Sequence, residues 1–225
     1  MFKKIILFIP FLLYAGPPML TDDPDVPNCG EFEINLASEL ERRETNTLTI
    51  PIVDFNYGIF PKVQFTIESS YIWEKSQHDF GATEVALKYN FYSNDIVSLA
   101  LYPHYIFYAN DSLFKESNSW EIMLPMSFKL SEKLSLVSSL SYIKPTKEQS
   151  HVEFGSYLEY ENNRDSYYVE DYWKEEPQTK DRLLINLGYL HEFNDGLAFI
   201  GSVGYEVQSS QKRATLGYLG LQVSF

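Results

Sequence analysis

The last twelve residues of the chain, Ala214 to Phe225, read ATLGYLGLQVSF, and apolar side chains recur there at every second position. Successive side chains of an extended strand point to opposite faces. One face of such a strand would carry Leu219, Leu221, Val223 and Phe225. The other face would carry only small or polar residues near the terminus. The stretch therefore predicts a strand with one face for an apolar environment and one for water.

The composition extends this prediction to the whole chain. Its 225 residues include 17 Tyr and 16 Phe, and aromatic side chains favour the pleated surface of strands. No shift in composition divides the chain, so we expect one domain. The net charge of -13 argues against a nucleic-acid partner, because phosphate binding requires a basic patch. The single cysteine, Cys29, excludes an internal disulfide and a multi-cysteine metal site.

Residues 1–15 are typical of a secretory signal peptide. Lys3 and Lys4 precede the apolar run IILFIPFLL, and small residues follow at Ala15 and Gly16. The apolar run is shorter than the about 20 residues that a membrane-spanning helix needs. We therefore expect an exported protein that crosses a membrane, if at all, with strands. Residues 16–30, rich in Pro and Asp, are expected to form an irregular periplasmic segment before a barrel of residues 31–225.

Alternation with a period of two continues through the rest of the chain and predicts an all-β fold. It favours a closed antiparallel up-and-down barrel of about twelve strands, each near the ten residues that a tilted transmembrane strand requires. The expected strands are 31–41, 47–58, 62–74, 82–92, 96–108, 119–130, 134–143, 151–161, 165–173, 181–193, 197–208 and 214–225.

The connections between these strands are expected to alternate in length. IFPK, SND, SEK and NDG indicate tight turns, whereas EKSQHDFG at 74–81 and similar polar stretches indicate longer loops. Residues 151–180 leave two alternatives, a hairpin in a twelve-stranded barrel or one long loop in a ten-stranded barrel. Pro103 and Pro125 fall inside expected strands and predict a bulge or a bend at each.

Two features favour a membrane barrel, apolar outside, over a soluble sheet protein. A closed barrel of this length satisfies every backbone group in lipid. Aromatic residues also fall near the expected strand ends, where the interfacial girdles of membrane barrels lie. These residues are Tyr57, Trp73, Phe91, Phe107, Trp120, Tyr142, Tyr160 and Phe193.

The chain terminus carries a third indication. A last strand that ends in an aromatic residue resembles the assembly signal of bacterial outer-membrane barrels. The positions that match are Tyr218, Leu221, Val223 and Phe225. The resemblance implies a protein of the bacterial outer membrane, with membrane lipid, lipopolysaccharide and the barrel-assembly machinery as partners.

Three further segments resemble one family of outer-membrane barrels, named for the putative meta-pathway of phenol degradation. The segments are GPPMLTDDP from Gly16, PIVDFNYGIFPKVQF from Pro51 and FGATEVALKYNFY from Phe80. Before the last of these, the family tends to have Gly-x-Gly-Asp where this chain has Asp79, Phe80, Gly81 and Ala82. The resemblance implies an outer-membrane channel or transporter for a small, hydrophobic or aromatic solute.

If apolar side chains face lipid, the charged residues between them face the lumen. The lumen-facing candidates are Glu31, Glu33, Glu68, Glu84, Lys88, Glu121, Lys129, Glu153, Glu159, Arg182, Glu192 and Glu206. Carboxylates dominate this set, so an open lumen would favour cations over anions. A barrel this narrow can also be filled by its own side chains, and residues 16–30 can add to a block by folding into the periplasmic mouth. The sequence therefore leaves two alternatives, a lumen that conducts solutes and a lumen that is blocked.

No sequence motif indicates catalysis, a metal site or a cofactor. His78, His104, His151 and His191 have no accompanying nucleophile motif such as G-x-S-x-G. An outer-leaflet lipid hydrolase or deacylase is the enzyme alternative, and it requires a Ser–His pair near the membrane edge. A structural or adhesive barrel that acts through its loops is the third hypothesis. Two acidic groups are interpreted as solvated: Asp22, Asp23 and Asp25 in a turn, and Glu170, Asp171, Glu175 and Glu176 in a loop.

Overall fold

The computed structural model describes residues 19–109, 111–177, 179–210 and 212–225. The predicted signal peptide, residues 1–15, and Gly16 to Pro18 lie outside this described part. Within it, no helix is both long enough and apolar enough to cross a membrane.

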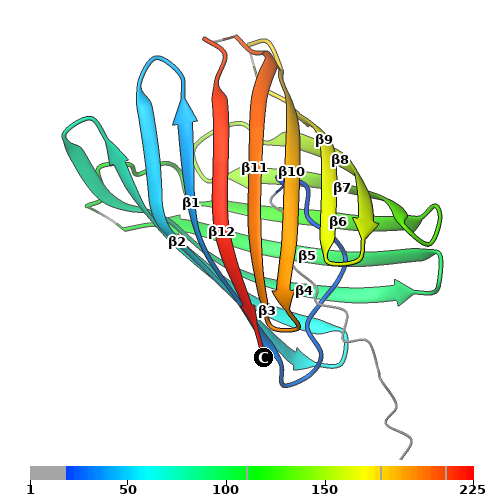
Figure 1. Cartoon of the computed structure of the whole chain (residues 1–225). Coiled ribbons are helices and arrows are strands. Elements are labelled where there is room, and N and C mark those ends of the chain that lie inside the picture. The colour runs from blue at the N-terminus through cyan, green and yellow to red at the C-terminus, as the bar shows by residue number, and fades with distance from the viewer. Residues whose placement is uncertain (1–18, 110, 178, 211) are drawn as a thin grey trace, which may run out of the picture.

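Twelve antiparallel strands form one closed barrel (Figure 1). Each strand pairs with its neighbours in sequence, and β12 pairs with β1 to complete the circle. The strands are β1 (Phe32–Arg42), β2 (Asn46–Phe60), β3 (Val63–Glu74), β4 (Gln77–Ser93), β5 (Val97–Tyr108), β6 (Ser119–Lys129), β7 (Leu134–Pro145), β8 (His151–Asn162), β9 (Asp165–Lys174), β10 (Arg182–Asn194), β11 (Leu197–Gln208) and β12 (Thr215–Ser224).

The C-terminal stretch closes the barrel. Strand β12 runs alongside β1 from Ser224 opposite Glu33 to Thr215 opposite Arg42. At the very end, the backbone N–H groups of Phe32 and Phe225 donate to each other's carbonyl oxygens at 2.9 and 3.0 Å. The two rings also meet edge to face with centroids 4.8 Å apart. The alternating terminus is thus the seam strand that leaves no sheet edge unpaired.

The prediction of twelve strands is confirmed, and the ten-stranded alternative is wrong. Residues 151–174 form the hairpin β8–β9, whose turn consists of Asn163 and Arg164. Asn163 has a φ of 61°, a left-handed conformation that asparagine tolerates better than most residues. Figure 1 places the C-terminus at the same end of the barrel as the β2–β3 and β10–β11 turns.

The predicted long loop at 74–81 is wrong. Strands β3 and β4 extend to Glu74 and Gln77, so that only two residues form the turn. The reason is an aromatic ladder on the extended hairpin: the rings of Trp73 and His78 lie 4.8 Å apart, and those of Tyr71 and Phe80 lie 5.2 Å apart. Cross-strand aromatic pairs of this kind stabilise a hairpin.

A bulge at Pro103 and at Pro125 is also wrong as a prediction, while the alternative of a bend at each stays a prediction. The β5–β6 pairing keeps one register past both residues. A proline lacks the N–H that the ladder needs, so it removes a hydrogen bond here without displacing the strand. A register shift instead surrounds Pro51 of β2, between Thr49 and Ile52.

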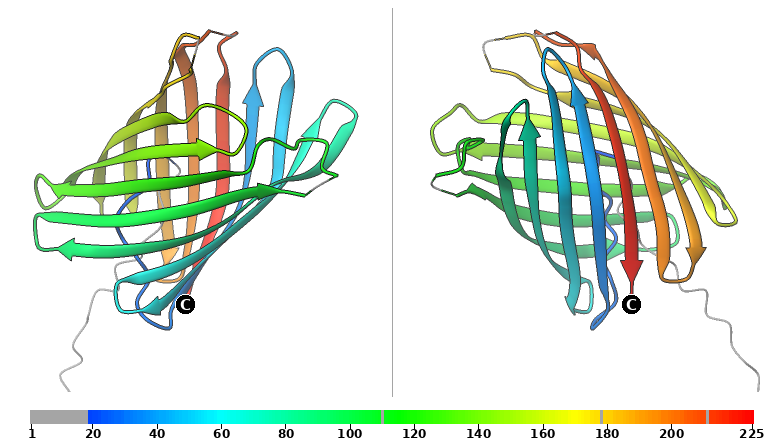
Figure 2. Two further views of the ribbon diagram at one scale, coloured as in Figure 1. Left: turned by 180° about the vertical axis from the view of Figure 1, so that it is seen from behind. Right: turned by 60° about the vertical axis from the view of Figure 1, so that its left-hand side comes forward.

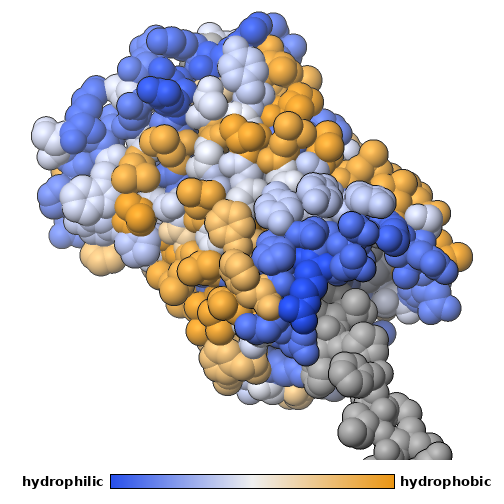
Figure 3. Space-filling view, viewed as in Figure 1, coloured by the Kyte–Doolittle hydropathy of each residue, from blue (hydrophilic) through white to orange (hydrophobic). Residues whose placement is uncertain are grey.

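The outer face of the barrel is apolar. Figure 3 shows hydrophobic residues over the wall, and hydrophilic residues at the upper end, where loops of Figure 1 lie, and in a second group at the lower right. Exposed outer residues include Leu219 and Leu221 of β12 and Phe225, which directly follows that strand. Six of the predicted girdle aromatics are exposed as well: Trp73, Phe91, Trp120, Tyr142, Tyr160 and Phe193. The remaining two, Tyr57 and Phe107, are half-buried.

The interior is polar, the reverse of a soluble sheet protein. The fully buried side chains include Thr21, Glu170, Glu206 and Gln222. A small apolar cluster lines one side, with Val137, Tyr157, Tyr168, Leu190, Ala198 and Ile200 as its buried members. An apolar exterior around a polar interior is the arrangement that a lipid-embedded barrel requires.

Candidate functional site

The N-terminal segment, defined here as residues 19–30, lies inside the barrel. Figure 2 shows it, in dark blue, enclosed by the strands in two different views. The backbone N–H of Thr21 donates to Glu170 Oε1 on β9 at 2.7 Å, and that of Leu20 donates to Oε2 at 3.3 Å. On the opposite side, Asn90 Nδ2 on β4 donates to the carbonyl oxygen of Pro24 at 2.9 Å. The segment is therefore held by both sides of the lumen.

Two glycines of the wall make room for this segment. A Cβ atom at Gly58 would lie 2.1 Å from the backbone oxygen of Asn28, and one at Gly155 would lie 2.0 Å from Thr21 Oγ1. Both separations are far inside van der Waals contact, so any larger side chain would collide with the segment. The backbone approach between wall and segment thus depends on glycine at these two positions.

The interpretation of Asp22, Asp23 and Asp25 as solvated turn residues is wrong. Asp22 forms an ion pair with the buried Lys88 of β4 at 2.7 Å, and Asp23 is buried. Burial raises the pKa of Asp23 well above its ordinary value, and it raises the pKa of Asp25 to about 6, although the Lys88 ammonium opposes both shifts. Lys88 also lies over the Tyr102 ring at 4.6 Å, and this cation is the electrostatic anchor of the segment.

Glu170 and Asp171 likewise lie in strand β9 and not in a loop. Glu170 is buried and accepts hydrogen bonds from the segment and, at 3.1 Å, from Asn186 Nδ2. Asp171 is exposed on the other face and accepts a hydrogen bond from Ser156 Oγ at 2.8 Å. The alternation Tyr168, Glu170, Tyr172 against Val169, Asp171, Trp173 was the signal that could have placed them.

Three carboxylates on adjacent strands form a row along the lumen wall, called here the carboxylate row. Asp54 of β2 lies directly opposite Glu68 of β3, and Glu68 lies directly opposite Glu84 of β4. Glu84 Oε1 is 2.6 Å from His104 Nδ1 on β5. Glu68 and Glu84 belong to the predicted lumen set. Asp54 was missed, although it alternates with Val53 and Phe55 in the sequence.

Two cavities occupy the space above the N-terminal segment. The inner cavity has a volume of about 420 Å³ and is lined by residues 19–22 of the segment, the carboxylate row, His104 and Glu121. The outer cavity, about 940 Å³, lies among the long loops and the ends of β5 to β9. Both are lined by Glu121 and Glu153, so the two cavities lie next to each other. A third cavity of about 70 Å³ is lined by Asp22, Asp25, Glu33 and Lys88.

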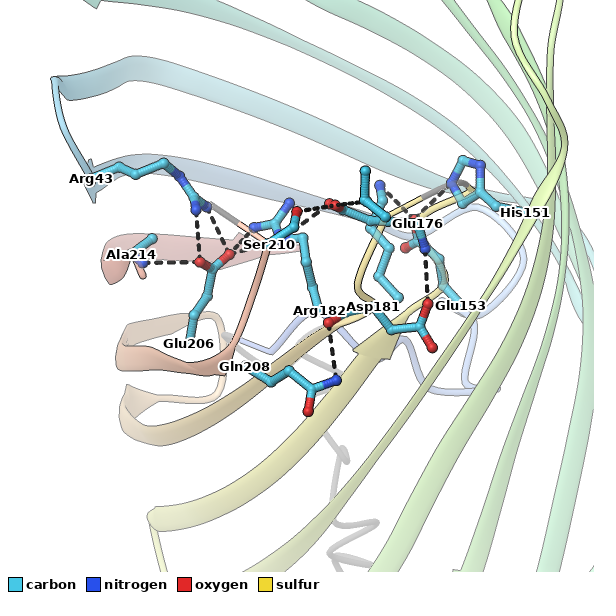
Figure 4. A network of polar contacts seen from close by, with 12 residues as sticks. Arg43, His151, Glu153, Glu176, Asp181, Arg182, Glu206, Gln208, Ser210 and Ala214 are labelled. Carbon is cyan, nitrogen blue, oxygen red and sulfur yellow. Dashed lines mark hydrogen bonds and ion pairs between the residues drawn. The ribbon is translucent and has the colours of Figure 1, made fainter. Parts of the chain in front are cut away.

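A network of arginines and carboxylates fixes the loops on one side of the outer end. Figure 4 shows Glu206 of β11 between Arg43, from the β1–β2 turn, and Arg182 of β10. The guanidinium of Arg43 donates to both carboxylate oxygens of Glu206 at 2.7 and 2.8 Å. The backbone N–H of Ala214 donates to Oε2 at 2.9 Å. One fully buried carboxylate thus joins β1, β10, β11 and the loop before β12.

The predicted lumen-facing residues fall into four groups. Glu33, Lys88 and Glu206 are buried. Glu68, Glu84, Glu121 and Glu153 line the cavities. Glu31, Glu159, Arg182 and Glu192 are half-buried, and Glu31 accepts a hydrogen bond from Asn28 at 2.9 Å. Lys129 is exposed. A common role of all twelve in selectivity stays a prediction.

The predicted assembly residues occupy both faces of β12. Leu221 and Phe225 are exposed on the outer wall, and Val223 is half-buried on the same face. Tyr218 has the opposite parity and lines the inner cavity. Tyr218 therefore shares no face with the other three.

Each of the four histidines is hydrogen-bonded to a phenol or a carboxylate within the described residues. His78 contacts Tyr71 at 2.7 Å, and His104 contacts Glu84. His151 contacts Glu153 at 3.1 Å and His191 contacts Asp165 at 2.8 Å. None of these recorded contacts is the Ser–His pair that the lipid-hydrolase alternative requires. The same described residues contain no group of three or more His, Cys, Asp or Glu arranged to hold a metal ion.

Comparison with known proteins reveals similarity in structure. No protein-family model matches the chain, and no curated protein matches it in sequence. Among solved structures, the KdgM porin in complex with disordered oligogalacturonate has a TM-score of 0.64 at 14% identity, over 85% of this chain and 99% of that one. The NanC porin has a TM-score of 0.64 at 10% identity, over 84% and 98% of the two chains.

A third similar structure is an outer membrane channel from Pseudomonas putida F1. Its TM-score is 0.60 at 13% identity, and the match covers 89% of this chain and 97% of that one. Identities this low establish a shared fold and leave the solute of this chain to be argued from its own lumen. The fold that this chain shares with them is a closed, twelve-stranded antiparallel barrel.

Proposed function

We propose that this chain is an outer-membrane channel for small solutes and that it favours cations over anions. The observation that carries the proposal is the pair of adjacent cavities inside a closed barrel with an apolar exterior. Carboxylates dominate the lining of the inner cavity, and a lumen lined by one sign of charge concentrates ions of the opposite sign.

The location and orientation follow from the same features. The predicted signal peptide at residues 1–15 and the apolar terminal strand support export and insertion into the bacterial outer membrane. Membrane lipid, lipopolysaccharide and the barrel-assembly machinery are the partners that this location entails. The short-turn end, with the C-terminus, would face the periplasm, as in other barrels of this kind.

The N-terminal segment is proposed to restrict the passage. It crosses the lumen between β4 and β9, and the cavity beside Asp22 has a volume of only about 70 Å³. The proposal combines the two alternatives for the lumen, conduction and blockage. A wide outer entrance would lead to a narrow inner part, whose width depends on whether the segment stays inserted.

The charge of the lumen bears on the class of solute. An oligogalacturonate, named for the KdgM structure, is a chain of sugar acids, and the carboxylates of this lumen would repel such a polyanion. A cationic or neutral small solute fits the lining better. Two further proposals rest on resemblance: membership of the family named for phenol degradation, and a hydrophobic or aromatic solute. They are supported by the sequence resemblance and by a similarity to the CymD monoaromatic hydrocarbon channel at 6% identity.

A role as an enzyme is not favoured. The recorded partners of the four histidines are carboxylates and a tyrosine, and a hydrolytic Ser–His pair requires a hydrogen bond between those two side chains. We therefore propose a channel without catalytic activity.

A liposome-swelling assay with neutral sugars tests whether the barrel passes solutes. Refolded mature protein is reconstituted, and swelling is followed with arabinose and with the trisaccharide raffinose. We expect arabinose to enter faster than into protein-free liposomes and raffinose to be excluded by the narrow inner part. Swelling at the protein-free rate for both sugars, with folding verified by heat-modifiable migration, would contradict the channel proposal.

A further inference from the structure

The carboxylate row places like charges directly opposite one another. Asn35 of β1 pairs with Asp54, Asp54 with Glu68, and Glu68 with Glu84. Directly opposite side chains in antiparallel strands have Cβ atoms about 4.5–5.5 Å apart, and like charges at such positions are destabilising. Three consecutive carboxylates on the lumen wall therefore require either shared protons or a positive charge between them.

The protein supplies little positive charge of its own to this row. The ammonium of Lys88 is 2.7 Å from Asp22 of the N-terminal segment. His104 contacts Glu84 alone within the row. Across the described residues, no ion pair is recorded for Asp54 or Glu68, and Asp54 Oδ2 accepts hydrogen bonds only from the neutral amides of Asn35 and Asn56, both at 2.9 Å.

Two buried acceptor atoms of the row and its neighbour have no donor. Asn35 is only 6% exposed, and its Nδ2 donates to Glu33 and to Asp54, which leaves Oδ1 as an acceptor without a partner. Asp54 Oδ1 also has no partner. Both residues line the inner cavity. A buried polar atom without a hydrogen bond is unfavourable, so the site favours a ligand that brings donors.

We propose that the inner cavity is a binding site for a small organic cation that carries several N–H donors, such as an alkylammonium or a guanidinium. This inference rests on the proposed channel function and adds its class of solute. The cation would lie against Asp54 and Glu68, neutralise the row, and donate to Asn35 Oδ1. Charge-assisted hydrogen bonds of this kind are stronger than neutral ones.

An organic cation fits the cavity better than a bare metal ion or a sugar. A volume of about 420 Å³ accommodates a chain of several carbon atoms. The acceptors without a partner are the amide oxygen of Asn35 and a carboxylate oxygen of Asp54, and an N–H donor can hydrogen-bond to each. A neutral sugar would satisfy acceptors but would leave the like charges uncompensated. Glu121 and Glu153 line both cavities, so the proposed site lies next to the outer cavity.

Isothermal titration calorimetry of the refolded, detergent-solubilised chain with 1,4-diaminobutane tests the proposal. The uncharged 1,4-butanediol has the same carbon chain and serves as the ligand control, and calcium chloride serves as the metal control. Glu68→Gln and Asp54→Asn each remove one charge from the row and keep the shape of the side chain. Glu132→Gln makes the same change in the exposed β6–β7 turn and serves as the protein control.

We expect saturable binding of the diamine and none of the diol. Each row variant should weaken diamine binding by at least about tenfold, the effect of losing one charge-assisted hydrogen bond, while Glu132→Gln leaves it unchanged. Heat-modifiable migration verifies that every variant is folded. Equal binding of the diol, diamine binding unaffected by both row variants, or calcium binding in place of the diamine would overturn the proposal.

The outcome separates this inference from the proposed channel function. Diamine binding by a barrel that passes no arabinose would support the binding site and contradict the channel. Arabinose entry by a barrel that binds no diamine would contradict the binding site and leave the channel intact.

Discussion

Replacement of Gly155 by alanine should expel the N-terminal segment from the lumen. The new Cβ would lie 2.0 Å from Thr21 Oγ1 and 3.1 Å from Thr21 Cβ. Overpacking of this kind costs about 1–3 kcal/mol, which changes an equilibrium by about 5- to 150-fold. Because the strands are fixed by their ladders and the segment is held by single hydrogen bonds and one ion pair, the segment should move and not the wall.

A thiol at position 21 reports this movement. Thr21 is 0% exposed, so Thr21→Cys in a Cys29→Ser background should react slowly with a charged thiol reagent. Addition of Gly155→Ala should accelerate labelling by about 5- to 150-fold, and it should increase the single-channel conductance. Gly217→Ala is the matched control, because a Cβ there meets no atom within 4 Å.

A rescue experiment tests whether the collision between Gly155→Ala and Thr21 causes the effect. A Cβ at Gly155 would also lie 2.7 Å from Tyr172 Cδ2 on the neighbouring strand, so the variant can strain the wall itself. Thr21→Gly removes both the Oγ1 and the Cβ contact and should return the conductance of Gly155→Ala toward that of the parent. Unchanged labelling in Gly155→Ala, or failure of Thr21→Gly to restore the conductance, would refute the reasoning.

Three further outcomes follow from the same contacts. Glu206→Gln removes the buried anion shared by the half-buried Arg43 and Arg182, which keep Glu41 and Glu176 as partners. It should lower the free energy of unfolding by about 1–3 kcal/mol, measured by urea denaturation in detergent. Glu68→Gln removes like-charge repulsion and should raise that free energy by up to about 1 kcal/mol; a decrease would argue that Glu68 is structural. The pKa of Asp25 rises from 3.8 to about 6 on burial, so the inserted segment holds a proton that the free segment loses. Insertion should therefore weaken as the pH rises from about 4 to 6, and labelling of the Thr21→Cys variant with an acid-active pyridyl disulfide, normalised to unfolded protein, should increase over that window.

The strand pattern was readable from the sequence because each strand has two unlike faces. Lipid outside and water inside impose a period of two that persists through all twelve strands. The failures are local. The hairpin arm at His78 and Phe80 was mistaken for a loop because its stability comes from rings on the partner strand, and such cross-strand pairs are invisible until the register is known.

The lumen could be predicted only in part. Alternation placed Glu68, Glu84 and Glu121 on the lumen face. It could not show that Asp54, Glu68 and Glu84 lie directly opposite one another on adjacent strands, since register depends on bulges and turns. The Asp-rich segment appeared solvated because its partner, Lys88, lies far away in the sequence and on the barrel wall. No sequence pattern indicated that Gly155 must be glycine, because the requirement comes from a close approach between two elements that are distant in the chain.

The measurement that tests the central claim most directly is the zero-current potential of the reconstituted mature barrel across a planar bilayer under a potassium chloride gradient. An acidic lumen predicts a potential toward the potassium equilibrium value, reduced in Glu84→Gln and in Glu121→Gln and unchanged in Glu132→Gln. A potential near zero or toward the chloride value, or one that neither lumen variant alters, would contradict the account of a cation-favouring channel.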